Sequence, residues 1–241
     1  MRILIVRHGE PDYAIDGLTE KGKREAELLA DKLEKEKIDY AYSSPMGRAR
    51  LTAEPTMRRL GMKAEICPWL REFSYVRVPL PDFPDGHILW DMLPSYMNEH
   101  PELYLKDGWL DSEHIKNSVA REEYERVTAS FDELLARHGY VRDGANYRAV
   151  RPNHDTLVFF CHFGLEAVLL SHIWNCSPYV IWQHACALPS SVTTVYTEER
   201  EAGVAQLRVC GFGDLSHLCS GGEEPSFAAR FRECATDDAR S

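Results

Sequence analysis

The sequence has no long hydrophobic run. The apolar stretch at the N-terminus ends at Val6, where Arg7 follows at once, so it is too short for the core of a signal peptide. No later stretch approaches the roughly 20 apolar residues that a helix needs to cross a bilayer. These absences predict a soluble, cytoplasmic protein.

The sequence also has no Cys-x-x-Cys pair, although it contains seven cysteines. An odd number of cysteines without paired spacing argues against a disulfide framework. The cysteines are Cys67, Cys161, Cys176, Cys186, Cys210, Cys219 and Cys234, and most of them lie in apolar stretches of the sequence. Reduced thiols in a cytosol are therefore expected.

Basic residues are scarce. The chain has 28 Lys and Arg against 38 Asp and Glu, which gives a formal net charge of -10. Such a balance excludes a general electrostatic attraction to nucleic acid or to anionic membranes. An anionic ligand must instead be held by a local cluster of basic side chains.

The hydrophobic pattern alternates between strands and helices. Strands are expected near 3–6, 40–42, 64–67, 156–161, 192–197 and 206–209. Thr19 is a good cap for a first helix, and further helices are expected over about 47–60, over 119–137, and after His162 through Trp174. Alternating strands and helices predict an α/β/α sandwich with a largely parallel central sheet, formed by a single domain over 1–241.

Residues 71–116 interrupt this pattern. The stretch has no clear periodicity and carries several prolines with aromatic residues between them. A long segment without clear elements inside a compact domain is usually functional, so an insertion that forms a lid or a binding wall is expected. A small packed subdomain without ligand contact is the alternative.

The candidate chemistry lies where strands end. In open α/β sheets, ligands bind beyond the carboxyl ends of the strands, and Arg7, His8 and His162 each follow a strongly apolar strand. Arg48 stands near the start of the helix that follows another strand. Two guanidinium groups and two imidazoles suit the oxygens of one phosphoryl group. A metal site is disfavoured because no carboxylate or thiolate stands at a suitable spacing from the two histidines.

Several motifs of this sequence resemble those of the histidine phosphatase superfamily, which includes cofactor-dependent phosphoglycerate mutases and many small-molecule phosphatases. The resemblance covers nearly the whole chain, and three main motifs occur in the expected order. The matching stretches are Val-Arg-His-Gly-Glu at 6–10, Leu-Thr-Glu-Lys-Gly at 18–22, Ser-Ser-Pro-Met-Gly-Arg-Ala-Arg-Leu-Thr-Ala-Glu at 43–54, Phe-Cys-His-Phe-Gly at 160–164 and Leu-Pro-Ser-Ser-Val at 188–192.

The resemblance implies a phosphoglycerate mutase-like fold and a phosphatase that works through a phosphohistidine. His8 would be the nucleophile, and Arg7, Arg48 and a protonated His162 would form the phosphate pocket. A neutral imidazole is a good nucleophile near neutral pH, and the positive groups would balance charge on the transferring phosphoryl group. The implied reaction needs no metal and no cofactor.

The leaving oxygen also needs a proton donor. In the family a Glu in a Leu-x-Glu pattern often serves, and Leu70-Arg71-Glu72 matches this pattern. The resemblance therefore implies that Glu72 is the general acid. The Gly-x-x-Glu-Gly stretch that commonly follows is absent, so Asp82, Asp85 and Glu113 are alternatives.

Hydrolysis is preferred over phosphoglycerate mutase-type transfer. Residues 73–81 do not match the extended motif of the mutase branch, and 116–118 depart from the Gly-Glu-Ser found in many members. A non-catalytic phospholigand-binding regulator remains an alternative, because a fold does not fix function. The expected partner is a small phosphorylated substrate of unknown identity. Candidate contacts to its leaving group are Arg71, Arg77, His87, Trp90, Tyr96 and Trp109.

Overall fold

The protein is built on an eight-stranded sheet. The computed structural model describes residues 1–80, 83–228 and 230–234, and the sheet order in it is β5-β4-β10-β1-β11-β12-β9-β8. In this order the strands are β5 (Glu65–Ile66), β4 (Tyr40–Ser43), β10 (Thr156–Cys161), β1 (Arg2–Arg7), β11 (Val192–Glu201), β12 (Val204–Asp214), β9 (Asn146–Ala149) and β8 (Tyr140–Asp143). A separate short pair consists of β2 (Pro11–Asp12) and β3 (Gly17–Leu18).

The sheet has a parallel half and an antiparallel half. β5, β4, β10 and β1 pair in parallel, whereas β11, β12, β9 and β8 continue from β1 in antiparallel pairs. The prediction of an α/β fold is confirmed, but the sheet is less parallel than expected. Tight hairpins join β8 to β9 and β11 to β12, and such short connections allow only antiparallel neighbours.

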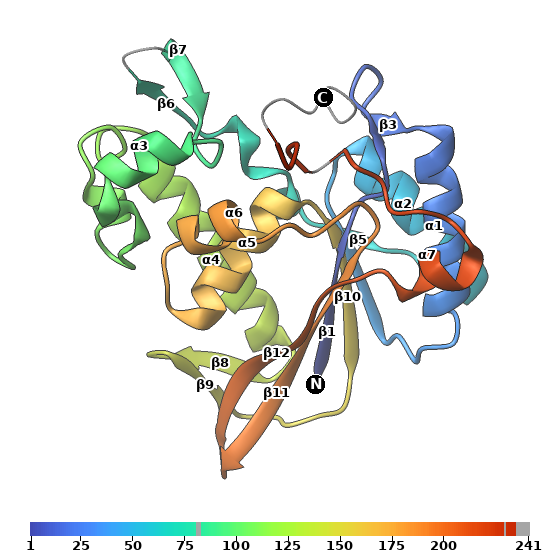
Figure 1. Cartoon of the computed structure of the whole chain (residues 1–241). Coiled ribbons are helices and arrows are strands. Elements are labelled where there is room, and N and C mark those ends of the chain that lie inside the picture. Colours follow the sequence, from blue (N-terminus) through green and yellow to red (C-terminus); the bar gives the residue numbers. More distant parts are fainter. Residues whose placement is uncertain (81–82, 229, 235–241) are drawn as a thin grey trace.

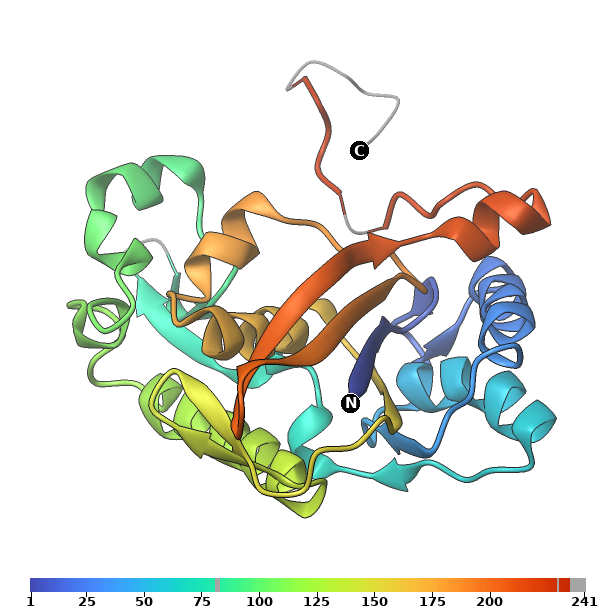
Figure 2. The same ribbon diagram turned by 90° about the horizontal axis from the view of Figure 1, so that it is seen from below.

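Helices cover both faces of the sheet (Figures 1 and 2). One face carries α1 (Glu20–Leu33) and α2 (Gly47–Leu60), and α7 (Ser216–Gly221) packs against α1. The other face carries α4 (Ala120–Arg137), α5 (Phe163–Trp174) and α6 (Tyr179–His184). As predicted, Thr19 caps α1, because its side chain accepts a hydrogen bond from Gly22 N at 3.0 Å.

The central strands are apolar on both sides because they lie between two cores. Along β1, Ile3 and Ile5 face the core under α4 and α5, whereas Leu4 and Val6 face the core under α1 and α2. β10 alternates in the same way. This explains the continuous apolar runs in these strands.

The excursion over 71–116 contains only short elements, as the lack of periodicity predicts. These are η2 (Phe73–Tyr75), β6 (Arg77–Leu80), β7 (Phe83–Ile88), α3 (Pro94–Glu99), η3 (Pro101–Tyr104) and η4 (Trp109–Asp111), preceded by η1 (Pro68–Leu70). The excursion lies on the side of α4 and α5 (Figure 2). Many of its apolar side chains belong to the core on that side, including Leu89, Met97, Leu103, Trp109 and Leu110.

No helix among the described residues is long and apolar enough to cross a membrane. All seven cysteines carry free thiols in the structure.

Because Trp109 is 1% exposed and stacks edge-on against Tyr124, Tyr179 and Trp182, we expect the excursion to unfold together with the rest of the chain. Trp109→Ala should lower the free energy of unfolding by about 3–5 kcal/mol, because it leaves a large cavity in the core. Urea unfolding followed by far-UV circular dichroism and by tryptophan fluorescence should give one shared transition. Trp174→Ala is the matched control, because Trp174 is 45% exposed. Two separate transitions in the wild type would contradict this expectation.

Candidate active site

The ends of three neighbouring parallel strands define the candidate site. Arg7 of β1 lies opposite Cys161 of β10, and Phe160 of β10 lies opposite Ser43 of β4. Each strand is followed by a polar side chain, and the ladder continues past the strand ends. His8 N donates to the Cys161 carbonyl at 3.0 Å, and Ser44 N donates to the Phe160 carbonyl at 2.9 Å.

The two histidines that follow β1 and β10 face each other. The ring centroids of His8 and His162 are 5.1 Å apart, and both side chains are almost fully buried. The structure thus brings together the residues that the strand pattern places at this edge of the sheet.

A backbone carbonyl sets the tautomer of His8. Its Nδ1 lies 2.7 Å from the Gly9 carbonyl oxygen, which can only accept, so Nδ1 carries the hydrogen. Burial holds the pKa of His8 well below its usual value, and the positive charge of Arg7 lowers it further. The ring is therefore neutral, and Nε2 keeps its lone pair. This is the form that a nucleophile requires.

Ser44 orients His162. The Ser44 hydroxyl oxygen accepts from Met46 N at 3.2 Å and lies 2.8 Å from His162 Nε2. If Ser44 donates its hydrogen to Nε2, the hydrogen of the neutral ring is on Nδ1. Nδ1 is buried and has no partner among the described residues. His162 can thus present an N–H donor to the site.

The surroundings of His162 disfavour the protonated form that the resemblance implies. Burial holds the pKa of His162 well below its usual value, and nearby His8, Arg48 and Arg7 lower it further. A neutral His162 still donates one hydrogen bond, but it contributes no full positive charge.

Arg7 and Arg48 supply the positive charge. Arg7 Nη1 donates to the Ala187 carbonyl at 2.5 Å, and Arg48 Nη1 forms an ion pair with Asp16 Oδ1 at 2.6 Å. In both side chains, Nε is buried and has no partner among the described residues. Each guanidinium is thus anchored at one end and keeps an N–H donor for a ligand.

Asp16 is a functional candidate that the sequence analysis missed. Its backbone has a φ of 47°, and its Oδ2 accepts from Gly47 N at 2.6 Å, at the start of α2. The same carboxylate thereby caps α2 and holds Arg48. A Cβ at position 47 would lie 2.2 Å from the Asp16 carbonyl oxygen, so this contact requires Gly47. From the sequence alone, an Asp-Gly pair such as that at 16–17 indicates only a turn.

Glu72 lies at the N-terminus of α5. Its Oε1 accepts from Phe73 N at 2.8 Å and from Leu165 N at 3.1 Å. A Cβ at position 164 would lie 2.5 Å from this oxygen, so Gly164 permits the approach. Burial raises the pKa of Glu72, although the Phe73 N–H and the charges of Arg7 and Arg48 oppose the shift. A carboxyl group with a raised pKa next to a phosphate pocket suits a general acid.

Two of the alternative acids are exposed, whereas His8 and His162 are buried. Asp85 and Glu113 are exposed, and Asp82 lies outside the described residues. Among the candidates for contact with a leaving group, Trp109 is in the core, and Arg71 stacks over Tyr75 with 4.2 Å between its guanidinium carbon and the ring centroid. Trp90 is the candidate that lies next to Glu72.

Glu166 is a second acid that the sequence analysis missed. It lies in the first turn of α5 and is 1% exposed, and its Oε1 has no partner among the described residues. Burial raises its pKa to about 7, although a hydrogen bond with Thr193 and the charge of Arg7 oppose the shift. The sequence does contain a signal for a buried acid at this position, because Glu166 is the only acidic residue of a mostly apolar helix and lies one turn after His162.

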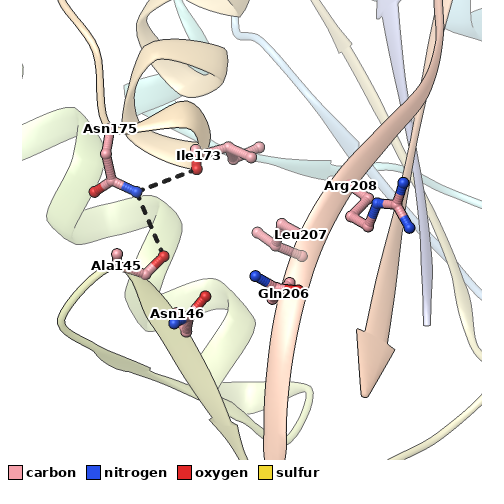
Figure 3. A pocket seen from close by; sticks show the side chains of 7 residues that line it. All are labelled: Ala145, Asn146, Ile173, Asn175, Gln206, Leu207 and Arg208. Atoms are coloured by element: carbon pink, nitrogen blue, oxygen red, sulfur yellow. Dashed lines mark hydrogen bonds between the residues drawn. The ribbon is translucent and has the colours of Figure 1, made fainter. Parts of the chain in front are cut away.

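A cavity of about 350 Å³ lies elsewhere, at the opposite end of α5 (Figure 3). Asn175 caps that end and donates to the carbonyls of Ala145 and Ile173, both at 3.5 Å. Twelve helical residues separate this end from His162, a span of roughly 18 Å. The cavity is lined by Ala145, Asn146, Ile173, Asn175, Gln206, Leu207 and Arg208, none of which belongs to the candidate site.

Within the described part of the chain, no group of three or more His, Cys, Asp or Glu side chains is arranged to hold a metal ion. The donors at the site are N–H groups of arginine and histidine, which suit an anion.

Comparison with known proteins agrees with this arrangement. A sequence model of the Histidine phosphatase superfamily (branch 1) matches residues 3–209. The chain belongs to the histidine phosphatase superfamily. Phosphoserine phosphatase 1 of Hydrogenobacter thermophilus is 24% identical over 231 residues, which cover 89% of this chain and 96% of that protein. Putative phosphoserine phosphatase 2 of the same organism is 32% identical over 152 residues, covering 58% of this chain and 68% of that protein.

A solved structure has the same fold as this histidine phosphatase. It is a phosphoserine phosphatase variant from Entamoeba histolytica in complex with phosphoserine, with a TM-score of 0.60 and 16% identity, covering 90% of this chain and 98% of the other. The predicted family and the phosphoglycerate mutase-like α/β fold are confirmed.

Glu166 gives this histidine phosphatase a distinct pH dependence of stability. Its pKa is about 7 in the folded state against 4.5 when unperturbed, so the folded state binds the proton more tightly, and stability falls as pH rises from 4.5 to 7. Glu166→Gln removes this loss and should raise the free energy of unfolding at pH 8 by up to about 3 kcal/mol. At pH 4 the difference should vanish. Urea titrations at both pH values test this, with exposed Glu133→Gln as the control. An equal effect at both pH values would contradict it.

Proposed function

We propose that this protein hydrolyses a small-molecule phosphomonoester through a phosphohistidine formed on His8 Nε2. The observation that carries the proposal is a set of buried nitrogen atoms, without partners among the described residues, on three side chains close to His8. Arg7 Nε, Arg48 Nε and His162 Nδ1 are buried without partners, and the charges of Arg7 and Arg48 lower the pKa of both histidines. A phosphoryl group brings three oxygens that can accept from these three donors.

In the first step, His8 Nε2 attacks phosphorus and the bond to the leaving oxygen breaks. Arg7, Arg48 and His162 donate to the three equatorial oxygens, so they stabilise charge in the transition state. The hydrogen bond from Nδ1 to the Gly9 carbonyl stabilises the positive charge that develops on the His8 ring. The departing oxygen needs a proton, because an alkoxide is a poor leaving group.

Glu72 supplies that proton. Burial raises its pKa and so favours the protonated carboxyl group, and the N–H groups of Phe73 and Leu165 hold Oε1 in place. After proton transfer, the Glu72 carboxylate removes a proton from water, which attacks the phosphohistidine. Inorganic phosphate leaves, and both His8 and Glu72 return to their starting forms.

Hydrolysis is favoured over phosphoglycerate mutase-type transfer and over a regulator without activity. A binding module would not need an unprotonated imidazole nitrogen facing the phosphate donors. The similarity to phosphoserine phosphatase 1 and putative phosphoserine phosphatase 2 of Hydrogenobacter thermophilus supports phosphoserine as the first substrate to test. With 3-phosphoglycerate, we expect free phosphate rather than the isomerised ester. A cytoplasmic location stays a prediction.

Replacement of the nucleophile should abolish turnover without unfolding the protein. His8→Ala should reduce hydrolysis of p-nitrophenyl phosphate and phosphoserine to background, because it removes the proposed nucleophile. Rapid quench of the wild type should trap acid-labile, base-stable phosphate on the protein. Exposed His184→Ala is the control and should keep its activity. Near-normal turnover by His8→Ala would refute the assignment.

The proton donor can be identified from its dependence on the leaving group. Glu72→Gln should slow hydrolysis of alkyl phosphates by about 10²- to 10⁴-fold, the usual contribution of general acid catalysis. For esters with good leaving groups, such as p-nitrophenyl phosphate, the rate of the first step should fall much less. Pre-steady-state kinetics of phosphoryl transfer to the protein measure this rate. Asp85→Asn and Glu113→Gln serve as controls. Equal slowing of both ester classes in that step would argue that Glu72 is not the acid.

A further inference from the structure

Four buried N–H groups around the candidate site lack a hydrogen-bond partner among the described residues. They are Arg7 Nε, Arg48 Nε, His162 Nδ1 and Trp90 Nε1. Three belong to the phosphate pocket described above, and the fourth comes from the excursion. A buried donor without an acceptor lowers the stability of the folded state. A donor that is kept unpaired beside a binding site therefore points to an acceptor that a ligand brings.

Trp90 Nε1 lies on the same side of α5 as Glu72. A Cβ at Gly164 would be 2.5 Å from Glu72 Oε1 and 3.0 Å from Trp90 Nε1, so both groups lie against the first turn of the helix. In the proposed reaction, Glu72 protonates the leaving oxygen. Trp90 therefore stands on the leaving-group side of the phosphate pocket.

α6 fixes the position of Trp90. The Tyr179 hydroxyl donates to the Leu89 carbonyl at 2.6 Å, and Gln183 Nε2 donates to the Trp90 carbonyl at 3.2 Å. Trp182 Nε1 from the same helix donates to the Gly164 carbonyl at 3.0 Å. These bonds tie the Trp90 backbone to the helix that also supports Gly164. A donor held in this way can discriminate between ligands.

We propose that Trp90 Nε1–H binds an oxygen acceptor of the leaving group and makes the site selective for phosphate esters of hydroxy acids, which carry a carboxylate near the ester oxygen. The inference rests on the proposed function. Two cations of the excursion are engaged elsewhere, since Arg71 stacks over Tyr75 and Arg77 Nη1 donates to the Gly86 carbonyl at 3.2 Å. A single neutral donor suits one carboxylate oxygen rather than a second phosphate.

Two probe ligands isolate this contact. O-phosphoserine and O-phosphoethanolamine differ only in the carboxylate. Their dissociation constants can be measured by isothermal titration calorimetry on the His8→Ala protein, which binds without turning over. We expect tighter binding of O-phosphoserine, and we expect Trp90→Phe in this background to reduce the preference about tenfold. Trp174→Phe is the matched control, because Trp174 is exposed at the other end of α5.

Inorganic phosphate serves as a third probe, because it lacks a leaving group. An equal loss of affinity for all three probes in Trp90→Phe would overturn the inference, since it would indicate general damage to the site. The inference would also be overturned if Trp90→Phe left the preference for O-phosphoserine unchanged. It would equally be overturned if the His8→Ala protein with Trp90 intact bound O-phosphoserine and O-phosphoethanolamine equally well. If the preference depends on Trp90 but the wild type hydrolyses no ester, the proposed function fails while the recognition role of Trp90 stands.

Discussion

The parallel pairing of β1 with β10 is the constraint on which the candidate site depends. It places the ends of the two strands side by side, and the hydrogen bond from His8 N to the Cys161 carbonyl carries the ladder one residue further. The two imidazoles are thereby held 5.1 Å apart. Because β10 also pairs with β4, Ser44 reaches His162 from the next strand. Three strands that are distant in sequence thus form one rigid edge.

The site retains several polar groups that the folded chain does not satisfy. Each buried N–H without an acceptor costs about 1–3 kcal/mol of stability, and an oxyanion that accepts from these groups recovers part of this cost. The two acids of the site differ in their surroundings. Glu72 receives two backbone N–H bonds, whereas Glu166 leaves one oxygen without a partner among the described residues. Burial raises the pKa of both, so the same desolvated region favours the protonated form of each carboxyl group.

The excursion has features that fit both alternatives of the sequence analysis, and its role as a lid or binding wall stays a prediction. Apolar side chains such as Trp109 and Leu103 lie in the core, which agrees with a packed subdomain. Trp90, from the same excursion, lies next to Glu72, which agrees with a binding wall. A segment without periodicity can do both, because short elements anchored by scattered apolar residues leave the polar groups between them available.

The sequence by itself determined the α/β class, most of the strands and helices, and the positions of Arg7, His8, Arg48 and His162 at strand ends or at a helix start. These features depend on local periodicity and on motifs of a few residues, which can be recognised without knowing what lies nearby in space. Only the tertiary structure decided which half of the sheet is antiparallel, that Asp16 holds Arg48, that Glu166 is buried, and that burial lowers the pKa of His162. The reason is physical: the pKa of a side chain and its hydrogen-bond partners depend on burial and on groups far away in the sequence, which come together only when the chain folds.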